Sequence, residues 1–165
     1  LFLIENLQYS EVTAGVYLGM ALAISTAARI LWGAACDFLL NSRRKITLGI
    51  IGFIAGSSFV LIGLVNNDTP IFVVMLLIGV MGASAMSWPG IFTTYIAEIS
   101  GSGRSGTTIG STNAIMRIGI IIIPPIFGLS ADITGSYTIG WLAMGSCAVI
   151  ATLAMLFIAK EPEPG

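Results

Sequence analysis

Charged residues are scarce in this sequence. Only 9% of its 165 residues are charged, whereas a soluble domain usually carries about 25%. Hydrophobic residues make up 56% of the chain, and the mean hydropathy is +0.97. Because so few charges cannot cover a surface exposed to water, the composition excludes a soluble globular protein.

Histidine is absent, and cysteine occurs only twice. The chain therefore lacks the commonest general base and metal ligand, and no nucleophile stands beside a base. Cys36 and Cys147 both lie in apolar runs, which is typical of core residues rather than of a disulfide. The net charge of -1 leaves no basic field that could bind nucleic acid. We expect no enzyme activity, no cofactor, no metal and no nucleic-acid partner.

Long apolar runs, in contrast, occupy most of the chain. A helix needs roughly 20 apolar residues to cross a bilayer, and these runs are too long and too irregular for membrane strands. The sequence therefore predicts an all-α polytopic membrane bundle. The predicted spans are 14–40, 46–65, 71–97, 107–130 and 137–159.

The first residues indicate a longer protein. Leu1–Ile4 is apolar and is interpreted as the end of an earlier span, and Glu5–Thr13 is predicted to be a loop. The chain does not begin with Met and has neither the charged start nor the cleavage site of a signal peptide. We expect residues 1–165 to be one membrane domain, a fragment of a larger protein.

Basic residues fall on one side of the predicted spans. The loops on the opposite side hold Glu5, Glu11, Asp68 and Asp132, with no Lys or Arg. Because cytoplasmic loops carry an excess of Lys and Arg, we expect the C-terminus in the cytoplasm and the protein in a plasma (inner) membrane. The basic loop residues are Arg43, Arg44, Lys45, Arg104 and Lys160.

Small residues recur at four-residue spacing in four of the spans. Such stripes let membrane helices approach closely, so they predict tight packing, and the alternative is that some stripes slide during gating. The stripes are Gly15, Gly19, Ala23 and Ala27; Gly52 and Gly56; Gly79, Ala83 and Ser87; and Gly106, Gly110 and Ala114.

Prolines lie inside the third and fourth spans. Pro89, Pro124 and Pro125 each remove a backbone donor and are predicted to bend their helices. Freed carbonyls in a membrane are tolerated only against protein or a wet cavity. The prolines therefore indicate a lumen or a moving gate, or else only the general frequency of proline in membrane helices.

Arg29 and Arg117 lie within spans, where charges are costly and usually functional. At about 1.5 Å per residue, Arg29 lies roughly 16 Å and Arg117 roughly 15 Å from the cytoplasmic end. No acidic residue of the sequence lies at that depth. Because Arg binds carboxylate through two hydrogen bonds, the pair predicts an anion site. Alternatively, an arginine pairs with an acid elsewhere in the whole protein or bonds only to freed carbonyls.

The loop after the first span carries a motif. Gly33 is followed by Asp37 and then by Arg43-Arg44-Lys45. This resembles the signature of the major facilitator superfamily, Gly-x-x-x-Asp-x-x-Gly-Arg-Arg/Lys, which follows the second helix of each six-helix half. Here the glycine before the basic cluster is missing, and the spacing from Asp37 to Arg43 is two residues longer.

Later segments extend the resemblance over nearly the whole chain. Tyr95 to Glu98 and Arg104 to Gly106 look like the cytoplasmic Glu…Arg-Gly pattern of the family, and Ile118 to Tyr137 looks like its eleventh helix. The spans are then helices eight to twelve of the C-terminal half, with a remnant of seven. Helices two to six are the alternative numbering.

The resemblance implies alternating access between two six-helix bundles. It also implies that Asp37 faces the N-terminus of the span that begins near Thr107, while Arg43, Arg44 and Glu98 form cytoplasmic ion pairs. Otherwise these charges only anchor the topology. The candidate gate residues are Gly33, Asp37, Arg43, Arg44, Glu98 and Arg104.

The predicted function is part of a secondary transporter for a small organic anion. Its arginines resemble those of oxalate/formate antiporters or monocarboxylate porters. A sugar or drug transporter is the alternative, because Trp32, Trp88 and Trp141 could stack on a sugar; Trp88 is the one retained as a substrate contact. A membrane-embedded enzyme, an assembly factor or a channel has little support. Expected partners are the solute, the bilayer and a missing N-terminal half.

Overall fold

A computed structural model describes residues 2–5, 7–101 and 103–160. Every regular element in that part of the chain is helical, which confirms the all-α prediction. Five helical stretches are long and apolar enough to cross a membrane, so this is a polytopic bundle. The helices are α1 (Phe2–Glu5), α2 (Glu11–Ala34), η1 (Ala35–Leu39), α3 (Arg44–Gly63), α4 (Ile71–Ser84), α5 (Pro89–Ser100), α6 (Ser105–Thr134) and α7 (Thr138–Ile158).

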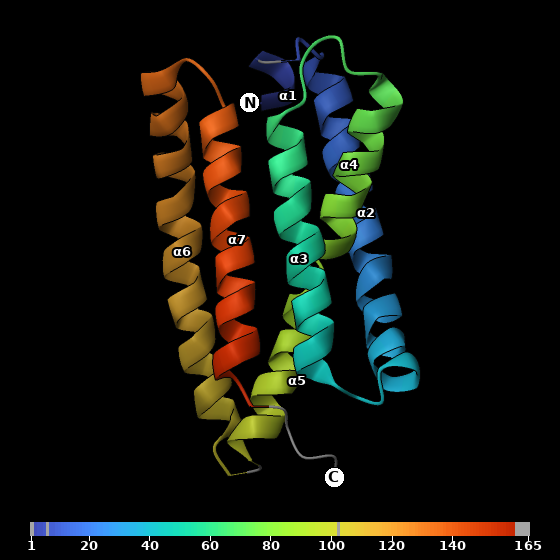
Figure 1. The fold of residues 1–165 in the computed structure, drawn as a ribbon, viewed down its shortest axis with the longest axis vertical. Helices are drawn as coiled ribbons and strands as arrows, with labels where there is room; N and C mark the ends of the chain where they lie inside the picture. The colour runs from blue at the N-terminus through green and yellow to red at the C-terminus, as the bar shows by residue number, and fades with distance from the viewer. Residues whose placement is uncertain (1, 6, 102, 161–165) are drawn as a thin grey trace.

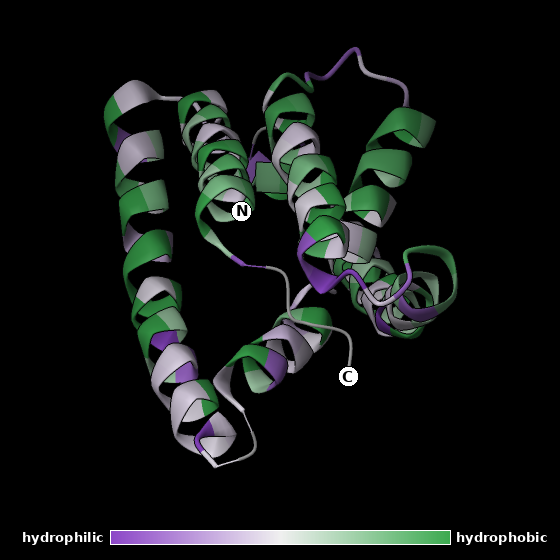
Figure 2. Cartoon of the chain, turned by 60° about the horizontal axis from the view of Figure 1, so that its bottom comes forward, coloured by the Kyte–Doolittle hydropathy of each residue, from purple (hydrophilic) through white to green (hydrophobic). Residues whose placement is uncertain are grey.

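The long helices alternate in direction, as short connections between spans require (Figure 1). α3 packs extensively on α7, α2 packs on α4, and α6 contacts α5 and α7. The distribution of hydropathy agrees with this arrangement. The connections are largely hydrophilic, and the helices are largely hydrophobic (Figure 2).

The start of the first span differs from the prediction. Ser10 caps α2, with its side chain accepting a hydrogen bond from the backbone N–H of Thr13, and Glu11 lies in the first turn. The helix therefore begins inside the segment predicted as a loop, since a serine cap and an early acid both favour a helix N-terminus. Phe2–Glu5 forms a short helix, and Leu1 lies outside the described residues.

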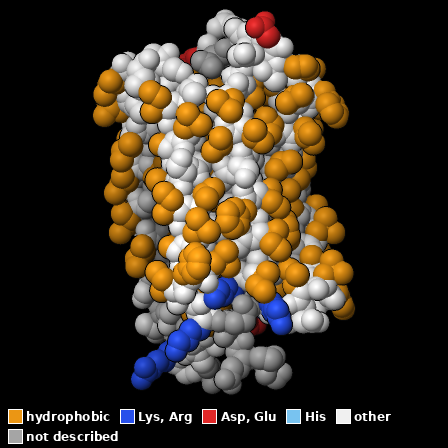
Figure 3. Space-filling view, viewed as in Figure 1, with side chains coloured by type: hydrophobic (Ala, Val, Ile, Leu, Met, Phe, Trp, Pro, Cys, Tyr) orange, Lys and Arg blue, Asp and Glu red, His pale blue; other side chains and the backbone are white. Residues whose placement is uncertain are grey.

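Charge divides the two ends of the bundle. On the face shown in Figure 3, Lys and Arg gather at one end, and hydrophobic side chains cover the sides between the ends. We call the end with Arg43, Arg44, Lys45, Arg104 and Lys160 the basic end, and the end with Glu5, Glu11, Asp68 and Asp132 the acidic end.

One of the predicted stripes of small residues forms a close contact, since an alanine Cβ at Gly56 would lie 3.2 Å from the carbonyl oxygen of Gly145. Gly82 lies outside the predicted stripes, and an alanine Cβ there would lie 2.5 Å from the carbonyl oxygen of Ala21. Backbones thus touch between α7 and α3 and between α4 and α2. At Gly15 and Gly110, an added Cβ would have nothing within 4 Å, so not every stripe packs within this chain.

The two proline sites behave differently. The third span is broken, because α4 ends at Ser84 and α5 begins at Pro89. α6, by contrast, continues from Ser105 to Thr134 with Pro124 and Pro125 inside it. Near Pro89 the α-helical hydrogen bonding is therefore interrupted by a turn, in which Ala85 and Trp88 keep right-handed helical φ and ψ values, whereas the double proline does not interrupt its helix.

A π-helical segment, η1, ends the first span. The backbone N–H of Leu40 donates to the carbonyl of Ala35 at 3.1 Å, and that of Ser42 donates to Cys36 at 2.8 Å. Asn41 and Ser42 then adopt positive φ values of 49° and 59°, which turn the chain into α3. Segments of this kind are rare and are often found at functional sites.

Candidate functional site

The break between α4 and α5 is held by side chains of α2. Arg29 donates from a terminal guanidinium nitrogen to the carbonyl of Met86 at 3.1 Å, and Ser25 Oγ donates to the same oxygen at 3.1 Å. Trp32 Nε1 donates to the carbonyl of Ala83 at 2.7 Å. The bond from Arg29 to a freed carbonyl is the contact that the second alternative includes, and contact with an anion stays a prediction.

Hydroxyls of the broken span satisfy further carbonyls. Ser84 Oγ donates to the carbonyl of Val80 at 2.6 Å, and Ser87 Oγ donates to that of Ala83. Both serines are fully buried, at 0% and 1% exposed. Because an unpaired backbone group in hydrocarbon is costly, these bonds explain how the unwound turn persists inside the bundle.

A cavity of about 660 Å³ opens beside the break. Met86 lines it, as do Leu18 of α2, Pro124 and Gly128 of α6, and Trp141 of α7. The first turns of the chain, at Phe2, also reach it. The broken span and the helix that carries Arg117 thus border one space.

Neither arginine lines the cavity, but each shares a helix face with a residue that does. At 100° per residue, Arg29 shares a face with Leu18, about three turns away, and Arg117 shares a face with Pro124, about two turns away. Arg117 is exposed and has no hydrogen bond or ion pair with any described residue. No described acidic side chain pairs with Arg29 either, so the structure leaves both charges without a counter-ion from residues 2–5, 7–101 and 103–160.

Trp88 occupies a different environment. Its ring meets that of Phe92 edge to face, with centroids 5.2 Å apart. It packs with Trp32 against a cluster that includes Cys36, Ile51 and Tyr95. Trp88, like Arg29 and Arg117, is not among the residues that line the cavity.

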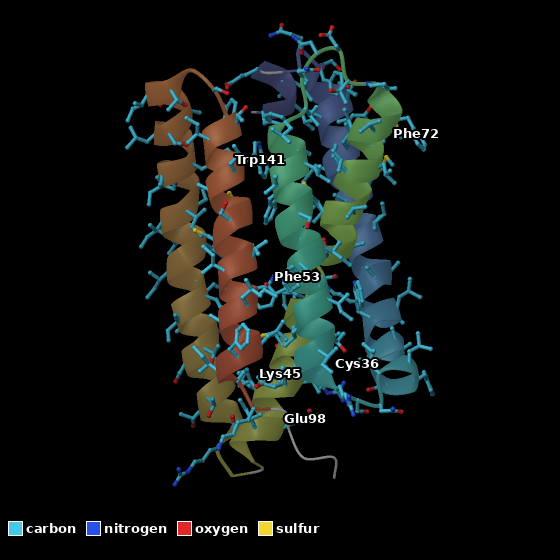
Figure 4. The ribbon with its side chains drawn as sticks, viewed as in Figure 1. Cys36, Lys45, Phe53, Phe72, Glu98 and Trp141 are labelled. Carbon is cyan, nitrogen blue, oxygen red and sulfur yellow. The ribbon has the colours of Figure 1, made fainter. Side chains whose placement is uncertain are left out.

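At the basic end, Arg44 joins three elements. It donates to Asp37 of η1 at 3.1 Å and to Glu98 of α5 at 2.8 Å. Its side chain is only 15% exposed, whereas that of Asp37 is 51% exposed. Cys36, Lys45 and Glu98 lie at this end in Figure 4.

The remaining motif residues lie around that network. Asp37 pairs with Arg44 instead of the predicted helix terminus, and the N-terminal end of α6 lies on the other side of the bundle in Figure 1. Arg43 precedes α3 and Arg104 precedes α6. Both are exposed and form no ion pair with a described residue. Gly33 lies one turn before Asp37 on α2, where an added Cβ would meet nothing within 4 Å.

At the acidic end, α1 is tied to the start of α7. Tyr137 donates its phenolic O–H to the carboxylate of Glu5, and this hydrogen bond raises the pKa of Tyr137 to about 12. The ring of Phe2 meets Tyr137 and Trp141 edge to face, at 5.9 and 5.7 Å. Phe127, two residues after Pro125, stacks on Tyr137 at 5.8 Å.

The family model of the Major Facilitator Superfamily matches residues 1–165, the whole chain. The chain belongs to this superfamily. Family membership and five apolar helices make it an integral membrane protein.

Two relatives of this superfamily chain are MFS-type transporters of Mycobacterium tuberculosis, one from strain H37Rv and one from strain CDC 1551, both named as uncharacterized. Each is 26% identical over 144 residues, which cover 87% of this chain and 32% of the relative. This chain therefore spans about a third of the length of the curated relatives it matches. No solved structure matches it.

Several residues that hold the break between α4 and α5 were not predicted from the sequence. Ser25 and Met86 were not singled out, and Trp32 was considered only as a sugar contact, whereas its indole N–H bonds to the break. The spacing of Ser25, Arg29 and Trp32 at i, i+4 and i+7 places them on one helix face, and this signal was readable in the sequence. Glu5 and Tyr137 carry no comparable pattern, because they are 132 residues apart.

Proposed function

We propose that this chain is part of a secondary active transporter that moves a small organic anion by alternating access, with Arg29 and Arg117 contacting the anion. One observation carries the proposal: Arg29 and Arg117 share helix faces with the cavity-lining residues Leu18 and Pro124, and neither has an acidic partner among the described residues. A carbonyl such as that of Met86 anchors Arg29 but does not neutralise it. An anion supplied by the solute would do so through paired hydrogen bonds.

The binding position in this proposal is the inner part of the cavity, near Met86. We expect a span that precedes α1 to run along the outer part, because Phe2, Leu3 and Ile4 line it. The other half of the transporter would complete the site. The basic end then faces the cytoplasm, in agreement with the excess of Lys and Arg there.

In the same proposal, the network of Asp37, Arg44 and Glu98 acts as a gate at the cytoplasmic side. Arg44 connects the ends of α2, α3 and α5 through two ion pairs. Such a network favours the state in which these ends stay together. Anchoring of the topology alone is the simpler role, and it predicts that Arg44→Gln leaves the balance of states unchanged.

Sugar transport is less well supported, because the tryptophans that would stack on a sugar are engaged elsewhere. Trp32 donates its N–H to Ala83, Trp88 packs on Phe92, and Trp141 lies against Phe59 with ring centroids 5.8 Å apart. Trp141 alone of the three lines the cavity.

Counterflow into proteoliposomes that contain the full-length protein tests the proposal. Labelled lactate and oxalate should accumulate, and a labelled neutral sugar should not. Arg29→Gln and Arg117→Gln should each lower anion counterflow at least about tenfold, equivalent to about 1.4 kcal/mol. Lys160→Gln is the control, because that exposed cation lies at the basic end and is not one of the candidate gate residues. Unchanged anion counterflow in both span variants, or accumulation of sugar alone, would contradict the proposal.

A further inference from the structure

The hydrogen bonds at the break share one unusual feature: two side chains of α2 converge on a single carbonyl. Ser25 Oγ and Arg29 both donate to the oxygen of Met86, each at 3.1 Å. A carbonyl oxygen has two lone pairs and can accept both bonds. Ser25 is only 2% exposed, so its bond is protected from water.

Trp32 bonds to the same turn from the same face of α2. It donates to Ala83, three residues before Met86, at 2.7 Å. Ser25 and Trp32 therefore flank Arg29 on α2, and they bond the carbonyls of Met86 and Ala83 at the interruption of the third span. The close approach of Gly82 to the backbone of Ala21 brings these donors within reach.

We propose that Ser25 and Trp32 are positioning residues that orient the guanidinium of Arg29 through the backbone of Met86; this rests on the proposed function, in which Arg29 contacts the anion. Arg29 uses one N–H on Met86, and its other N–H donors stay available. Met86 lines the cavity, so the bond to its carbonyl holds the guanidinium of Arg29 next to a residue of the cavity wall. A side chain already fixed in this way loses less freedom when the anion binds.

The first test does not depend on the solute. The full-length protein in detergent micelles is treated with phenylglyoxal, and modification of Arg29 and Arg117 is followed by mass spectrometry. Ser25→Ala and Trp32→Phe should each speed modification of Arg29 about three- to tenfold, the size expected of one hydrogen bond between membrane helices. Modification of Arg117 should keep its rate in every variant.

Thr26→Val is the matched control for this test. Thr26 neighbours Ser25, but its hydroxyl donates to the carbonyl of Leu22 in its own helix. Its loss should leave the rate at Arg29 unchanged, and Ser25→Thr, which keeps a hydroxyl, should restore the slow rate. Equal rates at Arg29 in wild type, Ser25→Ala and Trp32→Phe would overturn the positioning role.

The second test uses counterflow of labelled lactate in proteoliposomes. Ser25→Ala and Trp32→Phe should raise the KM for lactate about three- to tenfold and keep the maximal rate. A lower maximal rate with an unchanged KM would indicate a merely structural role and overturn the inference. If the wild-type protein does not move lactate but phenylglyoxal behaves as expected, the positioning stands and the proposed anion is wrong.

Discussion

Two proline sites in this bundle have opposite outcomes. Near Pro89 the span opens, and donors from α2 bind the carbonyls of Ala83 and Met86. At Pro124 and Pro125 the helix continues. The residues on either side are isoleucines, whose side chains have no hydrogen-bond donor. The comparison indicates that a proline removes one backbone hydrogen bond in either case. Donors from a neighbouring helix then determine whether the α-helix is interrupted.

The contacts that hold the two proline sites in place differ as well. Hydrogen bonds hold the first site, and aromatic packing holds the second, where Phe127 lies 5.1 Å from Trp141 and 5.8 Å from Tyr137 between ring centroids. A polar contact is lost when one donor is removed, while ring packing tolerates small changes. We therefore expect the first site to be the more sensitive to conservative substitution.

Gly82→Ala should lower the stability of the protein more than any other substitution considered. The added methyl group pushes α2 away from the end of α4. The added Cβ would lie 2.5 Å from the carbonyl oxygen of Ala21, and overpacking of this kind costs up to about 3 kcal/mol. Unfolding of the full-length protein by SDS in mixed micelles measures the loss. Gly110→Ala on α6, where nothing lies within 4 Å, is the control, and an equal loss in both variants would break the comparison.

Pro89→Ala should follow in size. The new N–H lets α4 and α5 join into one helix, which takes the carbonyl of Met86 away from Arg29 and Ser25. We expect anion counterflow to fall about tenfold, equivalent to about 1.4 kcal/mol. The measurement is labelled lactate uptake into proteoliposomes of the full-length protein. Wild-type uptake in this variant would show that the open turn has no part in transport.

The double variant Pro124→Ala, Pro125→Ala should be milder and opposite in sign. α6 is already helical there, so the new N–H groups can bond to the carbonyls of Ile120 and Ile121. Together the two restored bonds should stabilise the helix by about 1 kcal/mol, seen as a higher SDS midpoint with unchanged counterflow. If transport instead falls as far as in Pro89→Ala, the double proline works as a hinge.

Glu5→Gln should have the smallest effect, at the acidic end beside the second site. The Glu5 carboxylate raises the pKa of Tyr137 from 10.0 to about 12, so the amide should return this pKa toward 10. Ultraviolet titration of tyrosinate, with Tyr137→Phe as the reference, measures the shift. Because the folded pKa is raised, the contact stabilises α1 below about pH 10 and is lost as the pH rises through about 12. An unchanged titration would show that Glu5 is not the cause.

The positions of the spans could be predicted from the sequence, since hydropathy and length are local properties. The predicted span 46–65 corresponds to α3 at Arg44–Gly63, and 137–159 corresponds to α7 at Thr138–Ile158. The early start of α2 shows the limit of that reasoning, because a serine cap extends a helix beyond its apolar run.

The contacts made by the site residues were harder to predict from the sequence. Arg29 was singled out for its cost in a membrane, but its partner is a main-chain oxygen that leaves no mark on composition. Arg44 forms ion pairs with both Asp37 and Glu98. The motif alone could not show which of Arg43 and Arg44 pairs with each of these carboxylates. Both outcomes depend on which helices become neighbours, and a single sequence does not record that.

The anchor at Met86 also bears on how such sites can vary among related proteins. Because every residue type carries the same carbonyl, the side chain at position 86 is free to change without loss of the bond to Arg29. An evolutionary search for this feature should therefore look for Ser-x-x-x-Arg-x-x-Trp on one helix and a proline on another, and expect no preferred residue where the two meet.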